Sequence, residues 1–221
     1  MSRLPKLAMF YRHSRNSLAI SALVLGWACS ANAQARINPI PPDKQTDAQK
    51  AAIAAYQADR KSDPQGPYTA LLRSPDLMNR MRNLSDYIRF QSTLPARLRE
   101  LAVLTAARQW TIQYEWAGNS QVALASGVKP EIIKAIAEGR RPTGMAEDEE
   151  IIYDLCTELQ QHQSISDVTY NRAVAKFGEQ TVIETVVTVG YYTMVGMILN
   201  TSKTPPLGGA PFPLTSFPDN K

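Results

Sequence analysis

The sequence predicts an all-α protein with one main domain and an extension at each end. Apolar residues recur three and four positions apart along most of the chain, which is the period of a helix rather than of a strand. Prolines and short polar caps stand where these segments start, and glycines stand where they stop. With 221 residues, of which 44% are hydrophobic and 20% charged, the chain suits a single folded core.

The first 33 residues are predicted to be an export signal. They carry four basic residues and no acidic one, followed by an apolar core at residues 18–28. Ala31 and Ala33 offer small side chains at the two positions that a signal peptidase recognises. Cleavage is expected after Ala33 or, as a second choice, after Ala35. The mature protein is therefore expected to be periplasmic or secreted.

Membrane attachment is the alternative to a cleaved signal. The apolar core is shorter than a bilayer span, which disfavours a permanent anchor. Cys29 leaves a lipid anchor open, although the bulky Trp27 stands where a lipoprotein signal usually has a small residue. The first 33 residues contain no adjacent pair of arginines, which favours the general secretion route. We expect no membrane partner once the signal has been removed.

The charge of the mature chain argues against nucleic acid as a partner. The chain has 24 basic and 20 acidic residues, and four of the basic residues lie in the predicted signal. The mature part is therefore neutral overall, so no general electrostatic attraction to nucleic acid or to an anionic membrane is expected.

The mature chain is expected to have three parts. Residues 34–70 form an extension with one helix, residues 71–200 form the main domain, and residues 201–221 form a tail whose five prolines require an extended backbone. Prolines also deny a regular element to residues 36–46, and the sequence DPQGP at 63–67 interrupts the chain after the first helix.

The predicted helices have identifiable starts and stops. Pro75 and Pro130 stand in first turns, and Gly127, Gly139 and Gly178 stand at helix ends. Helices are expected at 47–61, from 75 onward, at 95–111, 113–126 and 130–138, from the acidic run 147–150 through Cys156, and at 166–176 and 182–199.

Residues 182–199 form the most apolar stretch of the mature chain. Periodicity alone permits a buried strand or a membrane span there. Glu184, three threonines and two glycines inside the stretch favour instead a buried helix at a subunit or bundle interface.

Cysteine and histidine are too few for a metal site in the mature chain. Cys156 lies among apolar residues at helical spacing and is expected to be a small buried side chain with no disulfide partner. His162 lies in the polar run QQHQS and is expected in a solvated loop. One cysteine and one histidine cannot supply a usual set of zinc ligands, so no metal is expected.

Polar residues concentrate at two points on otherwise apolar helices. Glu100 follows Arg97 and Arg99, and this cluster on its own predicts an ion pair that links helices. Glu115 and Asn119 are four residues apart and therefore share a helix face. Neither cluster identifies a function by itself.

The segment Leu94–Lys134 resembles the carboxymuconolactone decarboxylase family, whose fold is shared with alkylhydroperoxidase D. The resemblance rests on the helix that begins PARLRE, on the segment YEWAGN, and on Gly127 before a helix that starts at Pro130. It extends over about residues 71–200. It implies an alkylhydroperoxidase D-like helical bundle that forms homotrimers or homohexamers and uses no metal or organic cofactor.

The same resemblance argues against peroxidase activity. In alkylhydroperoxidase D-like proteins a glutamate, two cysteines and a histidine occupy positions that are Glu100, Ile112, Glu115 and Asn119 in this sequence. Thiol peroxidase chemistry needs a thiolate and a resolving thiol, and these positions supply neither. We therefore do not expect this activity.

The decarboxylase branch of the family implies acid–base chemistry on a small organic acid or lactone. In this interpretation Glu100 handles the proton, with its pKa raised by burial. Arg97 or Arg99 holds a carboxylate of the substrate, and Asn119 orients the substrate through hydrogen bonds. The predicted site is completed by Glu115 as a further catalytic residue and by Tyr114 and Trp116, which would shape the pocket.

We therefore expect a carboxymuconolactone decarboxylase-like protein that performs decarboxylation, isomerisation or lactone processing on a small carboxylated or cyclic organic substrate. It would be a lyase if active. Because Asn119 cannot transfer a proton as a histidine would, a non-catalytic small-molecule-binding protein and a structural oligomer of the same fold stay open as alternatives.

Overall fold

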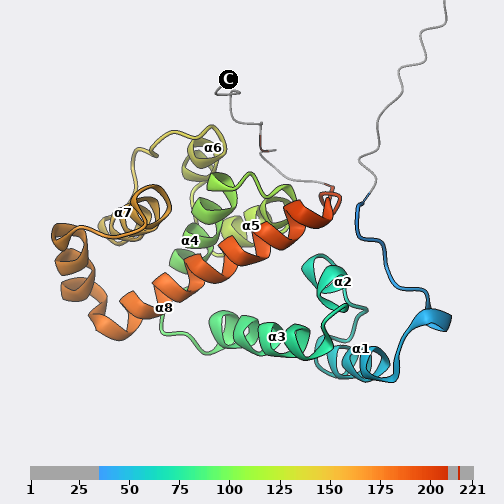
Figure 1. The fold of residues 1–221 in the computed structure, drawn as a ribbon. Coiled ribbons are helices and arrows are strands. Elements are labelled where there is room, and N and C mark those ends of the chain that lie inside the picture. The colour runs from blue at the N-terminus through green and yellow to red at the C-terminus, as the bar shows by residue number, and fades with distance from the viewer. Residues whose placement is uncertain (1–34, 209–213, 215–221) are drawn as a thin grey trace, which may run out of the picture. The chain divides into compact units, whose positions relative to one another are not determined.

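A computed structural model describes residues 35–208 and Leu214 of the chain (Figure 1). Within these residues it contains α-helices and one 3-10 turn, and no β-strand, which confirms the predicted all-α class. The predicted signal at 1–33 lies outside the described residues. The elements are η1 (Pro42–Lys44), α1 (Asp47–Arg60), α2 (Pro67–Leu71), α3 (Pro75–Phe90), α4 (Ala96–Gln109), α5 (Gln113–Ala125), α6 (Pro130–Ala137), α7 (Glu147–His162) and α8 (Asp167–Ser202).

Most helix boundaries follow from local capping chemistry. Thr46 precedes α1, where its hydroxyl accepts from the Gln49 N–H at 3.3 Å while the Gln49 side chain accepts from the Thr46 N–H at 3.0 Å. Gly127 and Gly139 follow α5 and α6 with φ angles of 94° and 72°, which a residue with a side chain rarely adopts. These glycines end the two helices as the sequence predicts.

The structure differs from the sequence prediction at three short segments. The Pro-rich lead-in contains η1, a single 3-10 turn. The five-residue α2 follows the DPQGP break, because Pro67 starts a turn whose Tyr68 and Leu71 side chains are buried against the rest of the fold. His162 is exposed as predicted, but it lies in the last turn of α7 rather than in a loop, since the helix continues to the left-handed residue Gln163.

Helix α8 combines the two predicted helices at 166–176 and 182–199. Gly178 interrupts it with φ 81° and ψ 160°, so the predicted break is present and the second helix begins immediately after it. Of the described helices, α8 is long and apolar enough to cross a membrane, but 56% of its most apolar window is buried inside the protein. The side chains of Thr185 and Thr188 are fully buried, which favours the predicted bundle helix.

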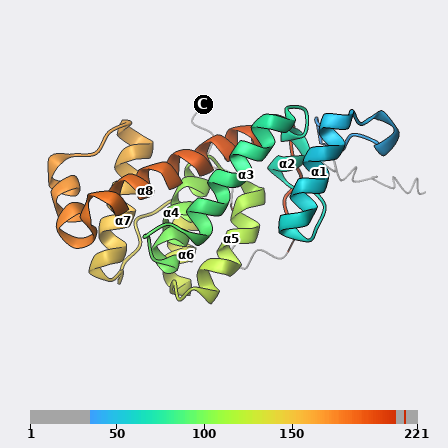
Figure 2. The same cartoon turned by 90° about the horizontal axis from the view of Figure 1, so that it is seen from below.

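The centre of the fold is α4, which packs against α5, α7 and α8 (Figures 1 and 2). Its residues 101–104 are all fully buried, so α4 has no solvent-facing side there. Three further contacts matter for the site. Helix α1 packs against α3, and α2 and α3 both pack against α8. Together with α5, these elements surround a cavity.

Apolar side chains remain exposed along α8 and α3. Ile183, Met194 and Met197 on α8, and Leu77 and Phe90 on α3, are all more than a third exposed. Exposed apolar residues gathered on neighbouring helices are typical of protein–protein interfaces. The expectation of a homotrimer or homohexamer therefore stays a prediction, with this surface as its candidate interface.

Candidate functional site

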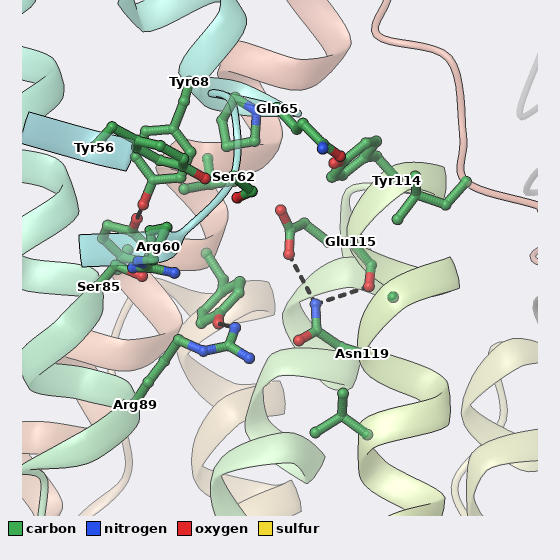
Figure 3. Close-up of a pocket in the computed structure, with 17 residues that line it drawn as sticks. Tyr56, Arg60, Ser62, Gln65, Tyr68, Ser85, Arg89, Tyr114, Glu115 and Asn119 are labelled. Atoms are coloured by element: carbon green, nitrogen blue, oxygen red, sulfur yellow. Dashed lines mark hydrogen bonds between the residues drawn. The ribbon is translucent and has the colours of Figure 1, made fainter. Parts of the chain in front are cut away.

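A cavity of about 320 Å³ lies between the α1–α2 connection, α3, α5 and α8 (Figure 3). Its wall is mainly polar and aromatic, unlike the apolar core beside it. The lining residues are Tyr56, Arg60, Ser62, Gln65, Pro67, Tyr68, Ser85, Arg89, Tyr114, Glu115, Gly118, Asn119, Val122, Tyr191, Tyr192, Val195 and Leu207.

Gly66 allows the α1–α2 connection to close one side of the cavity. Its backbone has φ 58° and ψ −125°, and a Cβ placed on it would lie 2.6 Å from the ring of Tyr114. A side chain at residue 66 would therefore push the connection away from α5. The close approach holds Gln65 beside Tyr114 at the cavity (Figure 3).

Glu115 is the carboxylate of the cavity. It lies in the first turn of α5, and its Oε2 accepts a hydrogen bond of 2.8 Å from the Asn119 Nδ2 one turn later. The same Nδ2 donates to the Glu115 carbonyl oxygen, also at 2.8 Å. Burial raises the pKa of Glu115, and the nearby charge of Glu100 adds to the rise, while the Asn119 bond and Arg89 oppose it.

Arg89 brings a cation to the same cavity from α3. One of its terminal nitrogens donates to the Tyr192 hydroxyl at 3.3 Å, and its guanidinium faces the cavity with Glu115 (Figure 3). Burial disfavours the charge, but Tyr192, Glu100 and Glu115 together raise the pKa of Arg89. Arg89 is therefore a permanent positive charge inside the cavity wall.

A second arginine, Arg60, lines the cavity from the end of α1 and forms an ion pair with Asp86 of α3. This pair ties the end of α1 to α3, and Arg89 is the cavity cation whose charge acts on Glu115. The cavity thus has a cationic side formed by α1 and α3 and a carboxylate on α5.

Five tyrosines supply most of the aromatic wall. The rings of Tyr56 and Tyr68 lie 5.0 Å apart, and the Tyr68 and Tyr191 hydroxyls are 3.5 Å apart. Burial raises the pKa of Tyr56 and of Tyr114, so both hydroxyls stay protonated at neutral pH. The wall therefore presents aromatic faces together with neutral hydroxyl groups, which suits a ligand that is partly cyclic and partly polar.

Glu100 is buried behind this cavity rather than exposed in it. The residue is 1% exposed, its Oε1 lies 3.3 Å from an Arg99 nitrogen, and its Oε2 has no hydrogen-bond partner among the described residues. Burial raises the pKa of Glu100, as expected from the sequence, while Arg99 and Arg89 oppose the rise. Its negative charge raises the pKa of Arg89 and of Glu115, both of which line the cavity.

Three of the four predicted substrate-binding residues lie away from the cavity. Arg97 forms ion pairs of 2.5 Å with Asp148 and with Glu149 at the start of α7, so it links α4 to α7. Trp116 is fully buried in the core and supports α5 from behind. Arg99 is engaged with Glu100 and does not line the cavity either. Of the predicted site residues, the structure brings Tyr114, Glu115 and Asn119 together.

The sequence prediction did not include the arginines of α1 and α3 or the tyrosines outside α5. Arg89 follows the core residue Ile88 and stands four residues after Ser85, which also lines the cavity. Ser85 and Arg89 therefore share one face of α3, and this spacing is the one signal that pointed to them. Nothing in the linear sequence indicates that this face meets α5.

Thiol and metal chemistry find no support in the described part of the chain. Cys156 is the one cysteine there; it is fully buried, and burial raises the pKa of its thiol, so it is not a reactive thiolate. No group of three or more His, Cys, Asp or Glu side chains among residues 35–208 is placed to hold a metal ion.

The fold and the segment that carries Glu100 and Glu115 agree with one known family. Residues 75–149 match the model of the carboxymuconolactone decarboxylase family. The resemblance inferred from the sequence is thereby confirmed, and the matched segment runs from the start of α3 to the start of α7. No curated protein matches the sequence significantly.

Solved structures confirm the alkylhydroperoxidase D-like fold. An alkylhydroperoxidase AhpD core protein from Ralstonia eutropha, described as peroxidase-related, has a TM-score of 0.64 at 12% identity, over 79% of this chain and 93% of its own. A putative antioxidant defence protein AhpD from Agrobacterium tumefaciens has a TM-score of 0.58 at 14% identity, over 66% and 100%. The debrominase Bmp8 in complex with 2,3,4-tribromopyrrole has a TM-score of 0.61 at 12% identity, over 79% and 93%. At these identities the likeness concerns the fold alone.

Proposed function

We propose that the protein performs cofactor-free acid–base chemistry on a small carboxylated or cyclic organic substrate in the cavity between α1, α3, α5 and α8. Decarboxylation, isomerisation and lactone processing each place negative charge on an oxygen and move a proton to or from the substrate. The observation that carries the proposal is that the cavity holds Glu115, whose pKa burial raises, opposite the permanent cation Arg89.

Glu115, rather than Glu100, is the residue we propose for the proton transfer. Its carboxyl group lines the cavity, whereas Glu100 is closed off behind it. A carboxyl group with a raised pKa holds a proton closer to neutral pH and can therefore act as a general acid and, after giving up that proton, as a base. Glu100 acts through its charge, which raises the pKa of Glu115 and helps to keep Arg89 charged.

Arg89 is the residue we propose for stabilising the anion. In a decarboxylation, the bond to the leaving carboxylate breaks and its electron pair moves onto a neighbouring carbonyl, which becomes an enolate. Arg89 stabilises the enolate oxygen, and Glu115 then gives its proton to the carbon that has lost carbon dioxide. The proton that Glu115 has lost is replaced from solvent.

Asn119 positions Glu115 in this proposal instead of orienting the substrate. Its Nδ2 already donates to the Glu115 carboxylate and to the Glu115 carbonyl oxygen. Both of its N–H groups are therefore engaged within α5. This arrangement holds the carboxylate in the cavity wall through one of its two oxygens (Figure 3).

The cavity wall suits a small cyclic ligand, and one structural neighbour was solved with such a ligand. Bmp8 is described as a debrominase and was solved with a halogenated pyrrole, which is a single small ring. The aromatic and hydroxyl wall of the present cavity is chemically suited to a ring of this size with polar substituents. We do not propose peroxidase activity, because the thiol it needs is absent from the cavity.

Non-catalytic binding of the same class of ligand is the second candidate. The observation that favours it is Asn119, which cannot accept and release a proton at the position where related peroxidases have a histidine. In this case Arg89 and the tyrosines would hold an organic anion, and Glu115 would contribute only a hydrogen bond. A structural oligomer of this fold would bind none of these ligands.

A ligand screen followed by turnover assays tests the proposal. Carboxylated lactones, simple lactones and aromatic acids are added to the wild type, to Glu115→Gln and to the control Glu131→Gln, whose residue is exposed on α6. We expect one chemical class to raise the melting temperature of all three proteins and only the wild type and the control to turn it over. Binding without turnover in the wild type would favour the binding protein, and no binding of any class would contradict both.

Export to the periplasm and assembly into a homotrimer or homohexamer complete the proposal. The basic and apolar segment at 1–33 supports the first. The exposed apolar side chains of α3 and α8 support the second.

A further inference from the structure

The segment after α8 leaves the helix in a fixed direction. Lys203 has a left-handed backbone with φ 51°, and the Thr204 N–H donates to the Leu199 carbonyl at 3.0 Å. The hydroxyls of Ser202 and Thr204 lie 2.7 Å apart and share a hydrogen bond. These contacts end α8 and direct the following residues back towards α5 rather than away from the fold.

This segment touches α5 at two places, one on each side of the Glu115 turn. Leu207 lines the cavity, and its Cδ1 lies 3.7 Å from the position that a Cβ on Gly118 would occupy. Leu214 is only 6% exposed, and its carbonyl oxygen accepts from the Gln113 side chain at 3.0 Å. A buried leucine and a backbone hydrogen bond distinguish this attachment from a loose end.

We propose that Leu207 is a specificity-determining residue that limits the size of the ligand at the α5 side of the cavity. This inference rests on the proposed function and assigns to Leu207 the part of the cavity wall that selects ligands by size. Gly118 contributes no side chain to the cavity, so the apolar side chain of Leu207 forms the surface there instead. The cations of the cavity lie on α1 and α3, and Leu207 contributes no charge.

The arrangement predicts an effect on ligand size and not on recognition of the anionic group. Shortening Leu207 enlarges the cavity beside Gly118 while leaving Arg89 and Glu115 in place. A larger acid then gains contact area, whereas a small acid that does not reach Leu207 gains nothing. A bulkier residue at this position has the opposite effect.

The first test compares two aromatic carboxylates that differ in size. The affinities of benzoate and biphenyl-4-carboxylate are measured by titration calorimetry with the wild type, Leu207→Ala, Leu207→Trp and the control Leu77→Ala, whose leucine is exposed on α3 outside the cavity. We expect Leu207→Ala to shift the affinity ratio by about tenfold towards the larger acid, and Leu207→Trp to shift it the other way. An unchanged ratio in both variants, with both acids bound, would overturn the inference and leave the proposed function intact.

The second test needs no ligand. In a Cys29→Ser background, Gly118→Cys places a thiol under Leu207, and the native Cys156 is fully buried and does not compete. We expect a methanethiosulfonate reagent to modify this thiol slowly in the full chain and several-fold faster in Leu207→Ala and in a chain that ends at Pro206. Equal rates in all three would overturn the inference. If neither acid binds the wild type while these rates differ as expected, the proposed function fails for this ligand class. The inference that Leu207 covers the cavity beside Gly118 is then still supported.

Discussion

Two groups of buried carboxylates in this protein have opposite surroundings. Glu184 of α8 accepts five hydrogen bonds. The donors come from the end of α3, from the α3–α4 connection and from the preceding turn of α8. The donors are the Tyr87 hydroxyl at 2.6 Å, the Ser92 hydroxyl at 2.8 Å, the Thr93 N–H at 2.6 Å, the Thr93 hydroxyl at 2.8 Å and the Gln180 amide at 3.0 Å. Glu115 accepts one side-chain bond, and Glu100 has an oxygen without a partner in the described structure.

The pKa values of the three glutamates follow the number of hydrogen-bond donors around each carboxylate. Although burial works in the other direction, the five donors lower the pKa of Glu184 to about 2. Burial raises the pKa of Glu115 and of Glu100 because few donors or cations compensate it. A saturated carboxylate stabilises the fold, whereas an under-compensated one next to a cavity is available for chemistry.

Glu115→Gln should remove most of the turnover of a substrate found by the ligand screen. A glutamine keeps the size of the side chain and its bond to Asn119 but cannot transfer a proton, so we expect a loss of about 100- to 10,000-fold in kcat. The free energy of unfolding should change by less than about 1 kcal/mol. Steady-state kinetics and urea unfolding measure the two quantities, and full activity in this variant would remove Glu115 from the mechanism.

Glu184→Ala should destabilise the fold without touching the cavity chemistry. It leaves the Tyr87, Ser92 and Thr93 donors without their acceptor, which costs about 2–4 kcal/mol in the free energy of unfolding. Glu179→Ala, on the exposed side of the same helix, is the matched control and should cost less than about 0.5 kcal/mol. Urea unfolding at neutral pH measures both. Equal effects of the two variants would mean that the Glu184 bonds do not stabilise the fold.

The stability of the wild type should depend on pH through Glu184. Because the pKa of its folded state lies below the ordinary value of 4.5, its contribution is complete above pH 4.5 and is lost as the pH falls towards about 2. The difference in unfolding free energy between the wild type and Glu184→Gln should therefore shrink by about 2–3 kcal/mol over this range. Unfolding curves measured every half pH unit test this, and a constant difference would contradict the lowered pKa.

Glu100→Gln should change the free energy of unfolding least, and it should stabilise the fold where the Glu184 variants destabilise it. A raised pKa in the folded state means that stability is lost as the pH rises through and above the ordinary value, since the buried charge must then form. The variant should be more stable than the wild type by about 1 kcal/mol at pH 8 and equal to it at pH 4. Thermal unfolding at the two pH values measures this. A destabilised variant at pH 8 would show that the Arg99 pair outweighs the cost of burial.

Most helices could be predicted because their signals are local. Prolines in first turns, glycines at helix ends and the apolar period place α3 to α7 within a few residues, and Gly178 marks the break in α8. Helix α2 could not be predicted in this way, because five residues are too few to show a period. It is held by the burial of Tyr68 and Leu71, which depends on the rest of the fold.

The site could be predicted only where its residues lie close together in the sequence. Glu115 and Asn119 share one face of α5, and the family resemblance, rather than this spacing alone, assigned them to the site. Arg97 was assigned to the substrate because it precedes Glu100, but the acids at the start of α7 bind it instead. Arg89 takes the cationic role that we propose for the site, and its distance of 26 positions from Glu115 leaves no local pattern to detect.

The most direct test of the account is a site-resolved titration of the glutamates by carbon NMR in protein labelled at the glutamate carboxyl carbon. Glu115→Gln and Glu184→Gln assign the two signals. We predict that the pKa of Glu115 lies above the ordinary value of 4.5 and that of Glu184 lies near 2. A pKa of Glu115 at or below 4.5 would mean that its carboxyl group is as fully compensated as that of Glu184, and the proposed acid–base role would lose its physical basis.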